Sequence, residues 1–124
     1  MTIIKLSTGT RTATAATDSY TFTNVIGQVK AVEITNSAST DYKAYSLQDN
    51  GSSVGEYIIG ASGAVLTVAT YDRFNVRINA EGPDSGAIAG VYVEPAVRGS
   101  IKIDVTNLTA ADTWSVNIYL ENNE

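Results

Sequence analysis

Apolar and polar side chains alternate with a period of two in three segments of this chain. The segments cover residues 73–79, 101–106 and 114–121. Successive side chains of a strand point to opposite faces, so this period places one face of each segment on a core and the other in water. We therefore predict three antiparallel strands, whose inward rows are Phe74, Val76 and Ile78; Ile101, Ile103 and Val105; and Trp114, Val116, Ile118 and Leu120.

Further short segments are rich in Val, Ile, Thr and Tyr and are separated by Gly, Asn, Asp and Pro, a composition that favours strands and turns. These predicted strands are Ile3–Leu6, Tyr20–Thr23, Val29–Thr35, Tyr42–Gln48, Glu56–Ile59, Val65–Thr70 and Ile88–Glu94. The best helical candidate is a single turn at Asn107–Asp112. Short strands at this spacing predict an all-β fold, an antiparallel β-sandwich resembling a jelly roll, with about 8–10 short strands.

The N-terminal segment Ser7–Thr17 differs from the rest because its residues are small, polar or β-branched, with no large apolar side chain. Such a segment can bury little area, so it is either an exposed edge strand or an arm that becomes ordered on a partner. Both readings remain open. We accordingly divide the chain into an extended N-terminal strand or arm at residues 1–17 and one β-sandwich domain at residues 18–124.

The chain contains neither histidine nor cysteine. Histidine is the usual general base near neutral pH, and both residue types are common metal ligands. Ser-His-Asp triads, Cys-His pairs and HExxH zinc sites are therefore excluded. We expect a protein that is not an enzyme, with no catalytic, cofactor-binding or metal-ligating residues.

The chain has eight Lys and Arg residues and a formal net charge of −5 at pH 7. The basic residues are scattered, whereas nucleic-acid binding needs a concentrated basic face. Attraction to anionic membrane surfaces is disfavoured for the same reason. The start of the chain lacks a basic segment followed by an apolar stretch, so no signal peptide is expected. We predict that neither nucleic acid nor a membrane is the partner.

Carboxylates offer the remaining routes to metal binding or catalysis. The aspartates in or beside predicted loops, which could suggest calcium, are Asp41, Asp49, Asp72, Asp84 and Asp112. They lack the dense acidic spacing of a calcium loop, and turn geometry explains them better. A glycosidase needs two facing carboxylates, and the candidates for such a pair are Glu33, Glu56, Glu81, Glu94 and Asp104. Their positions on polar faces or at strand ends favour ordinary solvated charges.

Two of the seven tyrosines, Tyr92 and Tyr119, are out of phase with the apolar residues around them. They should therefore face away from the core, whereas Trp114 is in phase and should lie in it. Outward tyrosines suit a protein interface or stacking on a sugar, and cross-strand pairing within the sheet is the alternative explanation.

The arrangement of segments resembles the small jelly-roll head-decoration, or cement, proteins of tailed bacteriophages. The likeness is carried by the small Thr-, Ala- and Gly-rich segment Ser7–Thr17, by the strand at residues 29–36 and by the closing strand at residues 114–121. It is a likeness of composition and architecture across nearly the whole chain, with no shared invariant motif. No functional residue can be transferred from the family on this basis.

The resemblance implies a non-enzymatic virion protein that binds the major capsid protein, often as a trimer, and bridges capsid subunits on the outer shell. Assembly in the cytoplasm of a bacterial host would be expected. From the residues themselves, the predicted partner contacts are Thr10, Arg11, Thr12, Thr14, Tyr92 and Tyr119. The alternative function is a lectin-like carbohydrate-binding β-sandwich module.

Overall fold

The computed structural model describes residues 2–37, 42–49, 56–59, 66–68, 70–76, 78–81, 87–93 and 96–122. Within these ranges every regular element is a β-strand, and the pairings are antiparallel, which confirms the predicted all-β fold class. The strands are β1 (Thr2–Ser7), β2 (Arg11–Thr12), β3 (Asp18–Asn36), β4 (Lys43–Asp49), β5 (Glu56–Ile59), β6 (Leu66–Val68), β7 (Tyr71–Asn75), β8 (Ile78–Glu81), β9 (Ala87–Val93), β10 (Ala96–Thr106) and β11 (Thr113–Asn122).

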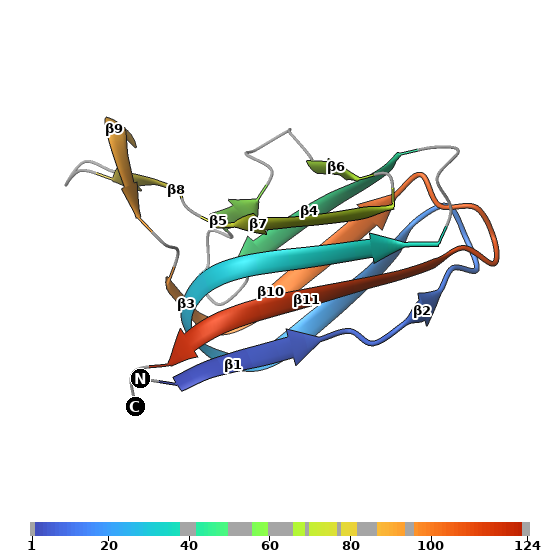
Figure 1. Ribbon diagram of the computed structural model, residues 1–124, viewed down its shortest axis with the longest axis horizontal. Helices are drawn as coiled ribbons and strands as arrows, with labels where there is room; N and C mark the ends of the chain where they lie inside the picture. Colours follow the sequence, from blue (N-terminus) through green and yellow to red (C-terminus); the bar gives the residue numbers. More distant parts are fainter. Residues whose placement is uncertain are drawn as a thin grey trace.

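The long strand β3 belongs to both layers of the fold (Figure 1). Its residues 18–28 pair with β10, and its residues 28–36 pair with β11. One layer, called here the β10 layer, therefore contains the first half of β3 with β10, β4, β5 and β6. The other layer, the β11 layer, contains β1, β2, β11, the second half of β3 and β7.

The sequence predicted two strands where β3 is continuous, at Tyr20–Thr23 and Val29–Thr35, and that prediction was wrong. The residues between them bend the strand without ending it. Asn24 has a positive φ of 57° and forms a bulge opposite the Gly99/Ser100 register shift. Bulges of this kind bend a strand and increase its twist while pairing continues on both sides.

The prediction of one strand over residues 73–79 was also wrong, because the chain leaves the main sheet in the middle of this segment. β7 ends at Asn75, and β8 begins at Ile78 and pairs with β9 in a separate two-stranded sheet. Val76, the last described residue before β8, still contacts the main sheet, because its N–H donates to the Lys30 carbonyl. Lys30 lies just after the bend of β3, so β7 loses its neighbour there.

The core lies between the inward faces of the two layers. Its fully buried side chains include Val32, Ile34, Val116 and Ile118 from the β11 layer and Leu47, Ile101, Ile103 and Val105 from the β10 layer. Trp114 is buried as predicted, and its ring meets the Tyr45 ring edge-on with centroids 6.1 Å apart. The alternating rows at 101–105 and 114–120 therefore identified the core correctly.

Buried polar groups in this core are satisfied in pairs. The Tyr45 hydroxyl donates to Asn36 Oδ1, and Asn36 Nδ2 donates to the Val68 carbonyl at 3.1 Å. The Lys43 side chain is only 2% exposed, and its Nζ lies 3.0 Å from Asp112 Oδ2. Asp112 belongs to the predicted helical turn, which is instead a non-helical connection closed by an Asp112 N–H to Thr109 carbonyl bond.

Asp112→Asn is expected to lower the midpoint of thermal unfolding at pH 7, because it leaves the Lys43 ammonium buried beside a neutral amide. The Thr109 N–H and Lys43 hold the pKa of Asp112 below its ordinary value of 3.8. A carboxyl with a lowered folded pKa stabilises the fold above its unfolded pKa and loses this effect as the pH falls through the folded value. The difference in the midpoint of thermal unfolding between wild type and Asp112→Asn should therefore become smaller below pH 3.8.

Circular dichroism melts between pH 2 and pH 7 provide the measurement, and Lys43→Met combined with Asp112→Asn is the control. Removing both charges should restore part of the lost thermal stability, since no buried ammonium is then left without its partner. A double variant that melts below Asp112→Asn would contradict this account.

Candidate functional site

The outer face of the β11 layer gathers charged, amide and aromatic side chains from four strands. The pairing registers bring them together: Lys5 lies opposite Tyr119, Asn117 lies opposite Glu33, and Glu33 lies opposite Arg73. Because strand residues alternate between faces, these residues point outward while Val32, Ile34, Val116 and Ile118 point into the core. We call this set the Glu33 cluster; its members are Lys5, Glu33, Tyr71, Arg73, Asn117 and Tyr119.

Glu33 is the centre of the cluster and accepts two hydrogen bonds. Asn117 Nδ2 donates to Glu33 Oε1 at 2.7 Å, and the Tyr71 hydroxyl donates to Oε2 at 2.9 Å. The bond from Asn117, the bond from Tyr71 and the positive charge of Arg73 lower the pKa of Glu33 below its ordinary 4.5. At neutral pH Glu33 is therefore an ionised acceptor that fixes its neighbours in place.

Arg73 and the two tyrosines form the exposed surface of the cluster. The Arg73 guanidinium lies 4.8 Å from the centroid of the Tyr119 ring and covers one face of that ring. Tyr71 remains 57% exposed, although its hydroxyl is tied to Glu33. The same bond raises the pKa of Tyr71, so its hydroxyl stays a donor at neutral pH. The cluster therefore presents aromatic and cationic groups whose positions are set before any partner arrives.

This arrangement is suited to binding and lacks the features of proton transfer. A carboxylate acting as general acid needs a raised pKa, usually in an apolar cleft. Glu33 has a lowered pKa and lies on an open sheet face. In the part of the chain that the structure describes, there is also no group of three acidic or other metal-ligating residues that could hold an ion. The same residues form no helix that could cross a bilayer.

Of the contacts predicted from the sequence, Tyr119 lies in the Glu33 cluster. Arg11 and Thr12 form β2 and pair with Trp114 and Thr113 at the opposite end of β11, and Thr10 and Thr14 are exposed beside them. The cluster and this N-terminal group are therefore separate. Tyr92 lies in β9, and its side chain is outside the described residues.

Arg11 is engaged within the molecule. Its guanidinium lies 4.9 Å from the Tyr20 ring centroid and 5.9 Å from the Trp114 ring centroid. Its Nε lies 3.7 Å from Asp18 Oδ2, which also accepts a hydrogen bond from Trp114 Nε1 at 3.1 Å. Arg11 thus joins β2 of one layer to the first half of β3 in the other and closes that side of the sandwich.

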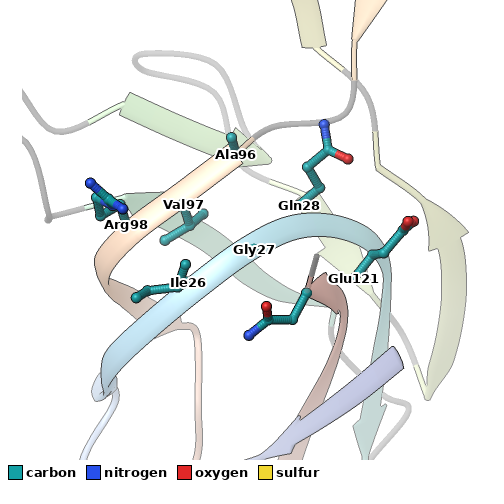
Figure 2. Close-up of a pocket in the computed structure, with 8 residues that line it drawn as sticks. Ile26, Gly27, Gln28, Ala96, Val97, Arg98 and Glu121 are labelled. Atoms are coloured by element: carbon teal, nitrogen blue, oxygen red, sulfur yellow. The ribbon is translucent and has the colours of Figure 1, made fainter. Parts of the chain in front are cut away.

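A hollow of about 430 Å³ lies at the bend of β3. Figure 2 shows Ile26 and Val97 on one side of Gly27 and the Glu121 side chain directed away from them. The Glu121 carboxylate is already paired with Lys30, at 2.8 Å. A Cβ added to Gly27 would lie 2.7 Å from the Glu121 carbonyl oxygen, so β3 and β11 approach each other here as closely as glycine allows. The hollow follows from this bend, and the Glu33 cluster is the better candidate site.

The outer face of the β10 layer differs from the face that holds the Glu33 cluster. Its outward residues at the centre are small hydroxyl or amide residues and one loose ion pair, Lys102 to Asp104 at 3.7 Å. The registers place Gln48 and Thr21 beside Lys102, and Ser46 and Ser19 beside Asp104. Aromatic side chains are absent from these central positions. Among these described positions the two outer faces therefore differ in chemistry, because the Glu33 cluster combines tyrosine with arginine and the centre of the β10 face does not.

Sequence reasoning missed Tyr71 and Asn117 as site residues and treated Glu33 and Arg73 as ordinary polar positions. Each points outward by alternation, but alternation does not say which strands become neighbours. Glu33 and Asn117 are 84 residues apart, and Glu33 and Tyr71 are 38 apart.

Comparison of the chain with protein-family models and with curated proteins found no match.

Proposed function

We propose that this chain is a non-enzymatic structural protein of a virion, which decorates a bacteriophage capsid and stabilises it by bridging capsid subunits. The observation that carries the proposal is the Glu33 cluster, a preordered group of tyrosine and arginine side chains on one outer face of the sandwich. Tyrosine and arginine are the residues that protein interfaces favour and that most often dominate binding energy. The resemblance to head-decoration proteins supports the choice of partner, the major capsid protein.

The geometry favours a protein surface over a sugar as the partner. Stacking on a sugar requires an open ring face, and the Arg73 guanidinium lies over the Tyr119 ring. Side chains already held by Glu33 lose little conformational entropy when a flat partner covers them, which favours binding. Tyr71 has an exposed ring beside the Glu33 carboxylate and the Asn117 amide, so carbohydrate binding is retained as the second candidate function.

The mechanism of stabilisation is mass action. A protein that binds the assembled shell and not its free subunits favours the shell by RT ln(1 + [L]/Kd). A trimer would present three copies of the Glu33 cluster, so binding by one copy raises the effective concentration of the other two. The proposal therefore includes a trimer, either in solution or formed on the shell.

Tyr71→Ala is expected to weaken binding to empty shells of the major capsid protein from the same source by about thirtyfold, a loss of about 2 kcal/mol typical of a hot spot. Co-sedimentation with the shells gives the affinity, and light scattering gives the oligomeric state. The matched control is Tyr42→Ala, since Tyr42 is 64% exposed and lies outside the cluster.

If Tyr71→Ala and Tyr42→Ala lose equal affinity for the shells, the Glu33 cluster is not the binding face. If the wild type does not bind the shells, the capsid role is wrong. Titration with neutral oligosaccharides is the parallel test. Shifts of the Tyr71 ring signals with sugar, but not with shells, would instead support carbohydrate binding.

A further inference from the structure

Arg73 Nη1 lies 3.8 Å from the single carboxylate of the Glu33 cluster, and the charge of Lys5 also acts on that carboxylate, although the whole chain carries a net charge of −5. We propose that Arg73, stacked on Tyr119, receives a carboxylate from an acidic surface of the partner protein. The inference rests on the proposed function, because it assigns a chemistry to the surface that the Glu33 cluster would cover. It places an Asp or Glu side chain of the partner directly over Arg73.

The hydrogen-bonding state of Arg73 leaves room for this carboxylate. Arg73 Nη1 lies 3.8 Å from Glu33 Oε2, which is longer than a hydrogen bond. The Glu33 oxygens already accept from Asn117 and Tyr71. The Arg73 side chain is 51% exposed, and the described residues place no other carboxylate within ion-pair distance of it. Its planar fork of N–H donors is therefore open to an acceptor from outside.

Stacking makes Arg73 a better receptor than a free surface arginine. The Tyr119 ring, 4.8 Å from the guanidinium carbon, restricts the plane of the fork. A fork with a restricted plane loses less entropy when it binds a carboxylate through two parallel hydrogen bonds. Lysine at this position would keep the charge but would lose the planar fork and its stacking on the ring.

Lys5 adds a second positive charge to the Glu33 cluster. It lies opposite Tyr119 in the β1–β11 register, and its charge acts on Glu33. The cluster carries Lys5, Arg73 and Glu33, whereas the residues outside it are negative in sum, so the cluster favours an acidic partner more than the chain as a whole does. Such a charge distribution orients the two proteins during their encounter and selects one face for docking.

The first test compares Arg73→Gln with Lys102→Gln in shell binding at 50 mM and 300 mM NaCl. Both variants remove one positive charge from an exposed strand position, but Lys102 lies on the opposite outer face. We expect Arg73→Gln to weaken binding at least tenfold at low salt and to reduce the salt dependence, and Lys102→Gln to stay within about twofold of wild type. Arg73→Lys should fall between wild type and Arg73→Gln.

If the wild type binds shells and Arg73→Gln binds equally well with the same salt dependence, this inference is wrong and the proposed function stands. A second test does not need shells. The Arg73 Nε–H signal of the full chain is followed by NMR during titration with a hexaglutamate peptide, with hexaglutamine as the uncharged control. A shift with hexaglutamate alone supports the inference, and no shift overturns it. A stronger response to oligogalacturonate would assign the site to an acidic glycan and overturn the choice of a protein carboxylate.

Discussion

Gly27→Ala is expected to lower the free energy of unfolding by about 3 kcal/mol or more, because it combines backbone strain with a steric clash. Gly27 has a φ of 151°, a conformation that residues with a Cβ rarely adopt. The new Cβ would also lie 2.7 Å from the Glu121 carbonyl oxygen, a backbone atom that cannot rotate away. Because this is the point where β3 passes from one layer to the other, relief of the clash would separate β3 from β11.

Gly9→Ala is the matched control for this prediction. Gly9 also has a positive φ, 64°, but a Cβ there meets no atom within 4 Å. Its cost is therefore the left-handed backbone penalty alone, about 1–2 kcal/mol. Both variants can be unfolded in urea and followed by the fluorescence of Trp114, the sole tryptophan of the chain. Equal losses at the two positions would show that the close approach of β3 to β11 is not the cause.

Trp114→Ala is expected to lower the free energy of unfolding by about 3–5 kcal/mol, the usual range for removing a large buried aromatic side chain. Trp114 is 1% exposed, packs on Tyr45, and donates from Nε1 to Asp18 Oδ2. Its removal leaves a cavity between the layers and takes one ring away from Arg11. Since the variant lacks tryptophan, urea unfolding is followed by circular dichroism.

Trp114→Phe separates packing from hydrogen bonding in the same position. Phenylalanine keeps an aromatic ring against Tyr45 but cannot donate to Asp18. We expect Trp114→Phe to lower the free energy of unfolding by less than half as much as Trp114→Ala, because most of the contribution of Trp114 comes from buried area and ring packing. A phenylalanine variant as unstable as the alanine variant would mean that the bond to Asp18 dominates.

The sequence predicted the class of the fold and much of its core because both depend on local alternation. The rows at 101–105 and 114–120 were each read from neighbouring residues, and burial follows the same period in the structure. The prediction failed at residues 73–79 and in β3, where the outcome depends on a remote neighbour. β7 ends where β3 bends away from it, and nothing in the sequence around Val76 records the position of Lys30.

The same limit applies to the candidate site. Tyr119 could be predicted because its outward direction follows from its own strand. Its partner Arg73 belongs to β7, which reaches this face only because β3 lies between β7 and β11. The Glu33 cluster is thus a product of strand order, which alternation does not determine. Arg11 shows the converse case, since its place in the segment Ser7–Thr17 made it a predicted contact, while its position beside Tyr20 and Trp114 engages it within the fold.

The pairing of β1 with β11 has a practical consequence for display. Thr2 lies opposite Asn122, so both ends of the described chain leave the molecule at one corner, as Figure 1 also shows. A cargo domain or affinity tag fused to either end would emerge there, three residue pairs from Lys5 and Tyr119, or about 10 Å along the strands. Fusions should therefore carry a flexible spacer long enough to keep the added domain from covering the Glu33 cluster.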